Sequence, residues 1–189
     1  MQARPFILLL LLSWTFPALS ATAGLQQDGL EQRERKLELP RYQLLARVQA
    51  DQHNHLASFT TDGCSGGLSE GWRFLARAIP AFKQIFGNRP PYESCCVVHD
   101  RAYWRGETEQ GFDKRQQADA ALQQCVIDFG KTHKTQFAHQ FHLSPAIIEH
   151  NFHIIAGLMY RAVRVGGMPC TGLPWRWGYG WPQCAEKEK

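Results

Sequence analysis

The chain of 189 residues has no long apolar run beyond its first residues and no internal repeat. Its one Leu-rich run, residues 6–12, is too short to span a bilayer, which argues against a transmembrane helix. No segment alternates apolar and polar residues as a strand does, so a sheet-based fold is not expected. A Gly-x-Ser-x-Gly motif is also missing, which argues against lipases of the α/β-hydrolase class. The formal net charge of +4 is too small to indicate a nucleic-acid partner.

The first residues have the order of a secretory signal peptide. Arg4 precedes the apolar run 6–12, and Ala21-Thr22-Ala23 follows as a small-residue cleavage site. We therefore expect residues 1–23 to be removed near Ala23 and the protein to be secreted or periplasmic. No cysteine lies near this site, which argues against a lipid anchor. Loss of Arg4 lowers the formal charge from +4 to +3, a mildly basic balance that suits an anionic membrane surface.

All six cysteines lie beyond this signal, at positions 64, 95, 96, 125, 170 and 184. An even number of cysteines in an exported chain indicates disulfides, which would help a chain of this size to stabilise a modest core. The cysteine count alone leaves the pairing open.

The rest of the chain is predicted to be helical. Residues 24–40 are charged and Gln-rich and are expected to form a mobile N-terminal arm, followed by one domain over residues 41–189. Apolar spacing and breaker residues predict helices over 41–52, 72–79, 92–105, 113–129 and 144–165. Glycines mark 59–71 as a loop, and the Trp- and Gly-rich stretch 170–184 is expected to be irregular. The predicted fold class is therefore all-α.

The most informative stretch is residues 95–103, which read Cys-Cys-Val-Val-His-Asp-Arg-Ala-Tyr. On a helix, Cys96, His99 and Tyr103 share one face, while Cys95 and Asp100 flank it. A histidine beside a carboxylate, on a helix that disulfides can hold, suits a general base next to a metal ligand. A disulfide-bonded helix with a surface His–Asp pair explains the same residues, so both interpretations stay open at this point.

The pattern Cys-Cys-x-x-His-Asp-x-x-Tyr resembles the active-site helix of secreted phospholipases A2. Two further elements occur in that family's order. The first is a second helix with an Asp six residues before a Cys, here Asp119 and Cys125; the other is a glycine-rich calcium loop around a Cys, here residues 62–67. The resemblance covers residues 61–126, the expected core of the domain, and points to the bacterial-type or atypical secreted branch. It implies a small disulfide-stapled fold with two antiparallel long helices, a calcium loop and, with the loop after it, a C-terminal helix over 144–184.

The resemblance also implies a disulfide pairing, which is Cys64–Cys96 and Cys95–Cys125, with Cys170–Cys184 remaining to close the C-terminal loop. Most family members carry one more bridge between the two long helices. Here both of its positions, Ala102 and Ala118, lack the cysteine, as a shared helix–helix geometry would predict.

The same resemblance assigns the catalytic roles. In secreted phospholipases A2 the histidine takes a proton from water and no covalent intermediate forms, so His99 would be the base here. Asp119 would accept a hydrogen bond from the imidazole and fix its tautomer, and Tyr103 would hydrogen-bond Asp119.

Calcium is the cofactor that the resemblance implies, and its expected ligands are the Asp100 carboxylate and the carbonyls of Gly63, Ser65 and Gly67. The ion would polarise the ester carbonyl and neutralise the developing oxyanion. The loop departs from the family's Cys-Gly-x-Gly-Gly because Ser65 and Leu68 replace two glycines. An ordinary Gly-rich turn is the alternative.

The predicted reaction is calcium-dependent hydrolysis of a glycerophospholipid ester to lysophospholipid and free fatty acid, at a phospholipid membrane surface or in micelles. A catalytically silent phospholipid- or partner-binding member of the fold is one alternative, and a structural, disulfide-rich envelope protein is another. No nucleic-acid partner is predicted, and no protein partner is identified. Residues 175–181 are either an interfacial anchor or a loop packed over the core. One apolar stripe is expected in the core, or lining an acyl-chain channel: Ile147, Ile148, Phe152, Ile155 and Met159.

Overall fold

The computed structural model describes residues 18–64, 77–78, 83 and 87–184, and the regular structure among them is helical. The helices are α1 (Ala18–Ala50), α4 (Glu93–Arg105), α5 (Gly111–Phe141) and α6 (Pro145–Gly166). The chain forms two compact units, Met1–Lys36 and Leu37–Lys189, and α1 contributes to both. None of the helices described here combines the length and the apolar character that a membrane crossing requires. The predicted all-α class is confirmed for these residues.

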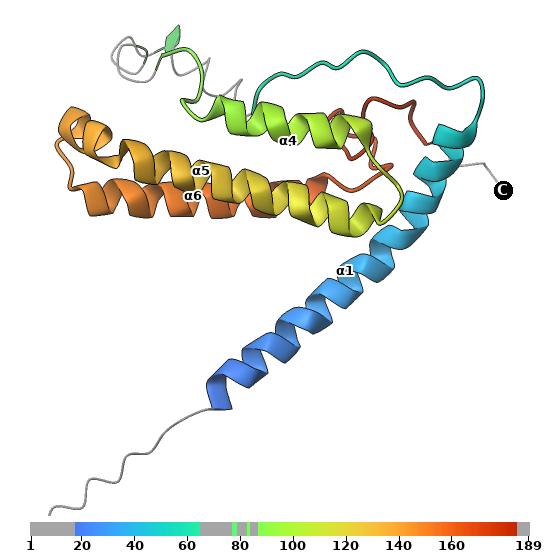
Figure 1. The fold of residues 1–189 in the computed structure, drawn as a ribbon, viewed down its shortest axis with the longest axis horizontal. Helices are drawn as coiled ribbons and strands as arrows, with labels where there is room; N and C mark the ends of the chain where they lie inside the picture. Colours follow the sequence, from blue (N-terminus) through green and yellow to red (C-terminus); the bar gives the residue numbers. More distant parts are fainter. Residues whose placement is uncertain (1–17, 65–76, 79–82, 84–86, 185–189) are drawn as a thin grey trace, which may run out of the picture. The chain divides into compact units, whose positions relative to one another are not determined.

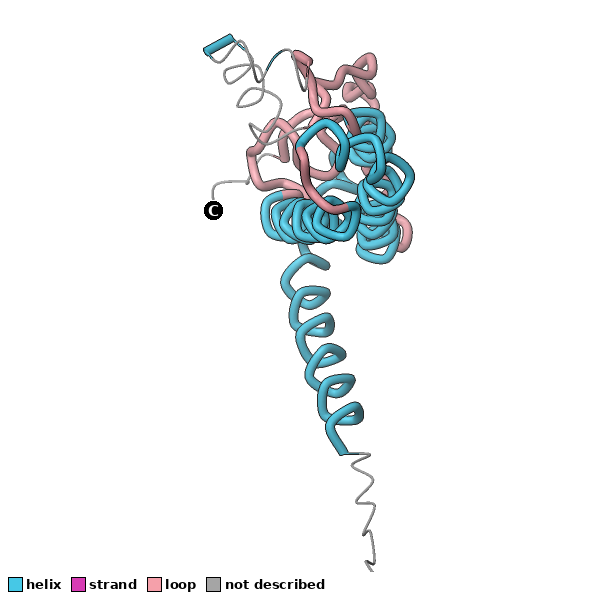
Figure 2. Tube along the Cα trace, turned by 90° about the vertical axis from the view of Figure 1, so that its left-hand side faces the viewer, coloured by secondary structure: helices cyan, strands magenta, loops and turns pink. Residues whose placement is uncertain are grey.

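Within the second unit, α5 and α6 lie side by side and run in opposite directions, because only a short turn joins them (Figure 1). Helix α4 packs against α5 and also runs antiparallel to it (Figure 1). Figure 2 shows these helices nearly end-on, with loops wrapped around them and no strand among the described residues. The helix pair expected from the sequence is therefore α4 and α5, and α6 is the expected C-terminal helix.

The ends of α4 and α6 follow the local sequence signals. Ser144 caps α6, since its hydroxyl accepts a hydrogen bond from the Ile147 amide at 3.3 Å, and Pro145 occupies the first turn. Helix α4 ends at Arg105 and is capped by Gly106, whose φ of 60° lies in the left-handed region. A side chain at Gly106 would also meet the backbone of Gly178, so glycine is required there for packing as well as for conformation.

Helix α5 is longer than predicted, because it ends at Phe141 rather than near Phe129. The predicted end of the helix was therefore wrong. Gly130 is buried within α5 against Phe152 of α6, and a Cβ at position 130 would clash with the Phe152 side chain. The helix predicted over 72–79 lies almost wholly outside the described residues.

The predicted mobile arm over residues 24–40 is instead part of α1, which runs unbroken through Pro40. Proline within a helix costs about 3 kcal/mol, because it removes a hydrogen bond and crowds the preceding turn. Burial offsets this cost, since Glu38, Tyr42 and Leu45 are all at most 5 % exposed. Tertiary contacts around residues 38–45 therefore override the local signal for a helix start at residue 41.

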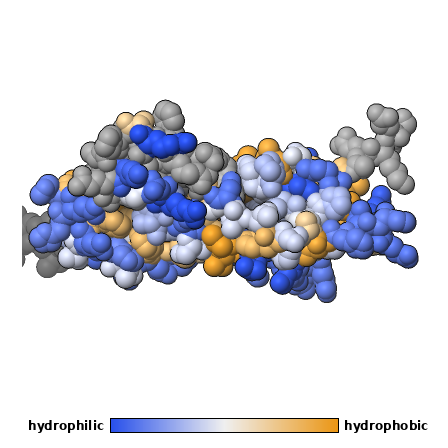
Figure 3. Space-filling view, turned by 90° about the horizontal axis from the view of Figure 1, so that it is seen from above, coloured by the Kyte–Doolittle hydropathy of each residue, from blue (hydrophilic) through white to orange (hydrophobic). Residues whose placement is uncertain are grey.

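Two apolar clusters form the core of the second unit. The larger one lies between α4, α5 and α6, and its buried members include Tyr92, Leu122, Val126, Phe137, Ile148, Phe152 and Ala156. The smaller one joins the end of α1 to the C-terminal segment, with Tyr42, Leu45, Tyr103, Phe112 and Trp177 buried. Ile147, which was expected in the core, is 46 % exposed. On the face drawn in Figure 3, apolar residues form patches among polar ones.

All three predicted disulfides are present: Cys64–Cys96, Cys95–Cys125 and Cys170–Cys184. The C-terminal segment 170–184 is irregular, as predicted, and it packs over the end of α4. Its backbone amides at Gly178 and Gly180 donate to the carbonyls of Tyr103 and Trp104 at 2.6 and 3.1 Å. Trp177 is 2 % exposed, which favours the interpretation of this segment as a loop packed over the core.

Candidate active site

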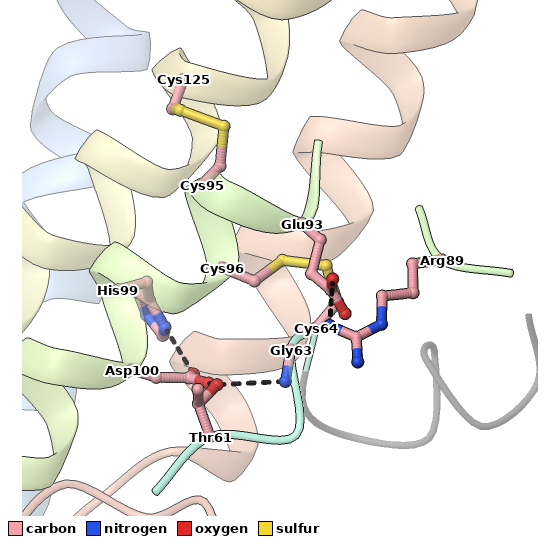
Figure 4. Close-up of a disulfide and its surroundings, with 10 residues drawn as sticks. All are labelled: Thr61, Gly63, Cys64, Arg89, Glu93, Cys95, Cys96, His99, Asp100 and Cys125. Atoms are coloured by element: carbon pink, nitrogen blue, oxygen red, sulfur yellow. Dashed lines mark hydrogen bonds and ion pairs between the residues drawn. A yellow bond between two sulfur atoms is a disulfide. The ribbon is translucent and has the colours of Figure 1, made fainter. Parts of the chain in front are cut away.

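His99 lies on the buried face of α4, about one turn after the two cysteines whose disulfides hold this helix. Cys95 is bonded to Cys125 of α5, and Cys96 is bonded to Cys64, just after the segment that passes beside α4 (Figure 4). Both bridges close loops of about 30 residues or more in sequence, and they restrain α4 from two sides. The imidazole of His99 is therefore presented from a helix whose position is covalently fixed.

Asp119 and Tyr103 meet the imidazole in the protein interior. His99 Nε2 lies 2.9 Å from Asp119 Oδ1, and the Tyr103 hydroxyl donates to the same oxygen at 2.7 Å. The ring centroids of His99 and Tyr103 are 4.2 Å apart. His99 is 6 % exposed and Asp100 is 4 % exposed, so these two residues are not the surface His–Asp pair that was the alternative. The three residues that the sequence assigned to catalysis lie together.

This arrangement sets the state of the imidazole. An ionised carboxylate can only accept a hydrogen bond, so Nε2 carries the proton and donates a hydrogen bond to Asp119, while Nδ1 of the neutral ring keeps its lone pair. Nδ1 lies on the side of Asp100, 3.8 Å from its Oδ1. Burial disfavours the charged imidazolium, but the contacts with Asp100 and Asp119 favour it more strongly and raise the pKa of His99 above its ordinary value. A neutral His99 here is a base whose protonated form is well stabilised.

An apolar cavity of about 270 Å³ opens beside His99. Leu158, Met159 and Val163 of α6 form one wall, and Leu122 of α5 contributes to another. The complete lining consists of Cys64, Cys96, His99, Asp100, Leu122, Leu158, Met159, Ala162, Val163 and Trp175. Polar groups thus lie at the His99 end only, which suits a ligand with an apolar chain and a polar reacting group.

A second hollow, of about 280 Å³, lies on the other side of Asp100 and is lined largely by oxygen-bearing residues. Its lining consists of Thr60, Thr61, Asp62, Asp100, Pro174, Trp175 and Tyr179. Asp100 and Trp175 border both the apolar cavity and this hollow. A group bound between Asp62 and Asp100 would therefore lie next to a ligand of His99.

Hydrogen bonds hold the walls of the oxygen-lined hollow. The Thr61 hydroxyl donates to Asp100 Oδ2 at 2.5 Å and accepts from the Gly63 amide at 3.0 Å (Figure 4). The Tyr179 hydroxyl donates to the Thr60 carbonyl at 2.7 Å. Burial raises the pKa of Tyr179, and the negative charges of Asp100 and Asp62 raise it further. The positive charge of Arg101 opposes this effect, and the hollow is lined by two carboxylates, Asp62 and Asp100.

The predicted calcium ligands are only partly placed by the structure. Asp100 borders the oxygen-lined hollow, and Gly63 is buried beside it with a φ of 86°, where the Glu93 side chain leaves no room for a Cβ. Ser65 and Gly67 lie outside the described residues. Asp62 was not predicted as a ligand, although a carboxylate directly before the loop glycine could have indicated it.

Among the described residues, no three or more His, Cys, Asp or Glu side chains gather as a metal site. The carboxylates of Asp62 and Asp100 with neighbouring backbone and hydroxyl oxygens are nevertheless a donor set of the kind that calcium takes. The residues present therefore fit a hard cation better than zinc, which prefers nitrogen and sulfur ligands.

The sequence did not indicate the buried charges behind Asp119. Arg115 and Arg164 both donate to Asp119 Oδ2, at 3.4 and 3.1 Å, and both also contact Glu38 of α1. Arg115 lies four residues before Asp119, a helical pair that could have been noticed. Glu38 and Arg164 are distant in sequence, and no local pattern marks them.

Comparison with known proteins finds no matching family model, no matching curated protein and no matching solved structure. The function is therefore inferred from the residues of the site and their geometry.

Proposed function

We propose that this chain is a phospholipase A2-like enzyme that hydrolyses a glycerophospholipid ester to lysophospholipid and free fatty acid, with calcium as cofactor. The observation that carries the proposal is the buried His99–Asp119–Tyr103 arrangement, with an apolar cavity on one side and an oxygen-lined hollow on the other. A general base, a place for an apolar chain and a place for a hard cation are the three parts that this reaction needs.

The proton transfers follow from the tautomer of His99. Its Nδ1 lone pair takes a proton from a water molecule at the cavity, and the water oxygen attacks the ester carbonyl carbon. The ester C–O bond then breaks, and the imidazolium returns the proton to the departing alkoxide oxygen, which leaves as the lysophospholipid hydroxyl. Asp119 holds the ring through Nε2 and stabilises the imidazolium, while Tyr103 fixes Asp119. No protein nucleophile is required.

Asp62, Asp100 and the Gly63 carbonyl are the described groups that would hold calcium, together with the predicted carbonyls of Ser65 and Gly67. When bound, calcium supplies Lewis-acid polarisation of the ester carbonyl. The hydrogen bond from Thr61 orients the Asp100 carboxylate toward the hollow that it shares with Asp62. Gly63 lets the chain turn at the start of the loop.

The proposed substrate and partner are a phospholipid and the surface that contains it. Leu158, which lines the apolar cavity, is also 62 % exposed, so the wall of the cavity continues onto the surface. The same exposed face of α6 carries Ile147, Ile154 and Val165. With Leu158 these residues are spaced by seven, four and seven positions, which places all of them on one side of a helix. An apolar rim beside the cavity supports entry of an acyl chain from a membrane or micelle.

We also propose that the protein is exported, as a secreted or periplasmic protein. The competing function is that of a catalytically silent lipid-binding protein. In that case the apolar cavity and the exposed stripe of α6 would keep their lipid-binding role, and His99 would contribute nothing to turnover. The experiment below separates these two functions.

The test is fatty-acid release from vesicles of mixed zwitterionic and anionic glycerophospholipids, by the oxidised protein in calcium. His99→Gln should lower kcat by roughly a hundredfold to ten-thousandfold, the usual contribution of a general base. His150→Gln, an exposed histidine of α6, is the matched control and should retain full activity. Vesicle binding without release by the wild-type protein would favour the silent lipid-binding function, and equal release by wild type and His99→Gln would remove the assignment of the base.

A further inference from the structure

A buried charge network lies behind the candidate active site and involves all four described helices. Its charged members are almost inaccessible: Glu38 is 2 % exposed, Arg115 and Asp119 are 0 %, and Arg164 is 7 %. Glu38 comes from α1, Arg115 and Asp119 from α5, and Arg164 from α6, while α4 contributes His99 and Tyr103. Burial of four charges is costly unless each is paired, so their arrangement requires a physical reason.

Asp119 divides its two oxygens between catalysis and this network. Oδ1 accepts from Tyr103 and the His99 imidazole, whereas Oδ2 accepts from Arg115 and Arg164. The two guanidiniums therefore hold the carboxylate plane from the side opposite the imidazole. Rotation of Asp119 away from His99 would break both contacts with Oδ2, so the arginines fix the direction in which Oδ1 points.

Glu38 neutralises the second of the two positive charges. Its carboxylate accepts hydrogen bonds from Nη2 and Nε of Arg115 and lies 3.4 Å from Arg164 Nη2. The Tyr42 hydroxyl also donates to it, at 3.2 Å. Two arginines thus face two carboxylates in the interior. Without Glu38, Arg115 and Arg164 would both lose the carboxylate that they share besides Asp119.

The arginines also tie the network to the end of α6. Arg115 Nη1 donates to the Val163 carbonyl at 3.1 Å, and both terminal nitrogens donate to the Arg164 carbonyl at 3.3 Å. The last carbonyls of a helix lack partners within the helix, and a cation there is favourable. Val163 lines the apolar cavity, so the same guanidinium contacts both the catalytic carboxylate and the cavity wall.

We propose that Glu38, through Arg115 and Arg164, is a positioning residue for the His99–Asp119 pair. Glu38 touches neither the cavity nor His99, and it acts by sharing the two guanidiniums so that Asp119 keeps one oxygen for the imidazole. Removal of the Glu38 carboxylate takes a shared partner from both guanidiniums, which loosens their hold on Asp119 Oδ2 and so on the direction of Oδ1. The effect on turnover rests on the proposed function, but the effect on the His99–Asp119 hydrogen bond does not.

The test compares Glu38→Gln with Glu31→Gln in the full oxidised chain. Glu31 is the matched control, because it lies on the same helix and pairs with an arginine, Arg35, at 3.6 Å on the surface. We expect Glu38→Gln to lower kcat roughly tenfold or more, with KM changed less than about twofold. The Nε2-bound proton of His99, observed by NMR without lipid, should shift in Glu38→Gln and stay in place in Glu31→Gln.

The charge-balanced variant Glu38→Gln/Arg164→Gln separates positioning from folding. It removes Arg164 together with its Glu38 partner and leaves Arg115 in contact with Asp119, so it should regain part of the lost kcat and return the His99 proton signal toward the wild-type position. If Glu38→Gln alone does not fold, kcat and the His99 proton signal of the double variant are compared directly with those of the wild type. Folded Glu38→Gln protein with wild-type kcat and an unshifted His99 signal would overturn the proposal. If the wild type releases no fatty acid, the NMR comparison still decides it.

Discussion

At the scale of single residues, the resemblance to secreted phospholipases A2 singled out His99, Asp119 and Tyr103, because the motifs that carry it have fixed spacings along helices. Asp100 could also be predicted as a site residue, because it is adjacent to His99 in the sequence. Glu38 and Arg164 could not be predicted, because their charged partners lie more than 40 residues away and only the packing of α1 and α6 brings them to the network of Asp119. Buried ion pairs between distant segments leave no periodic trace in a sequence.

The raised pKa of His99 has a consequence for stability that is measurable without substrate. A folded-state pKa above the unfolded value of 6.5 means that the folded protein holds the proton more tightly. The resulting stabilisation is fully present below 6.5 and is lost as pH rises through the folded-state pKa. We expect the free energy of unfolding of the calcium-free wild type, relative to His99→Gln, to fall over this range.

Urea unfolding in chelator at several values between about pH 5.5 and 8.5 measures this difference. The variant serves as the control, because it keeps every other titrating group. A difference between wild type and His99→Gln that stays constant or grows with rising pH would contradict the assigned contacts of His99 with Asp100 and Asp119.

At the scale of elements, the sequence predicted the start and end of α6 and the end of α4, where capping residues act locally. It failed where tertiary contacts decide. Helix α1 continues through Pro40, and helix α5 continues past Gly130, a position at which Phe152 of α6 leaves no room for a side chain. Helix α6 shows a further division. One face packs into the core through Ile148, Phe152 and Ala156, and the opposite face exposes an apolar stripe.

The exposed stripe of α6 should contribute to vesicle binding. We expect Ile154→Ser/Val165→Ser, at positions 49 % and 75 % exposed, to lower the partition coefficient onto anionic vesicles roughly tenfold, since each loses apolar area that a membrane would cover. Neither position lines the apolar cavity, so hydrolysis of a monomeric short-chain phospholipid should be unchanged.

Leu37→Ser/Leu39→Ser is the matched control, because these leucines of α1 are 72 % and 48 % exposed. Cosedimentation with vesicles should show less than about a twofold effect for this pair. Equal losses for the two double variants would mean that general hydrophobicity, rather than the face of α6, governs the binding. No loss in either would remove α6 from the membrane-binding surface.

At the scale of the whole molecule, three disulfides and a buried charge network hold the described helices around one histidine. The pairing of the cysteines followed from a resemblance over residues 61–126, and all three bridges are present. Two of them restrain α4, and the third closes the segment whose Trp175 borders both hollows beside Asp100. The calcium loop is the part that the sequence predicted in most detail and that the described residues cover least.

The central claim is that His99 activates water for direct attack on a phospholipid ester. Its most direct test is hydrolysis of vesicle phospholipid in ¹⁸O-labelled water by the oxidised protein, with calcium and with chelator, followed by mass spectrometry of the products and of the protein. We predict one ¹⁸O atom in the released fatty acid, none in the lysophospholipid, no acylated protein and no release in chelator. Acylated protein, release that persists in chelator, or no release in calcium would contradict the account.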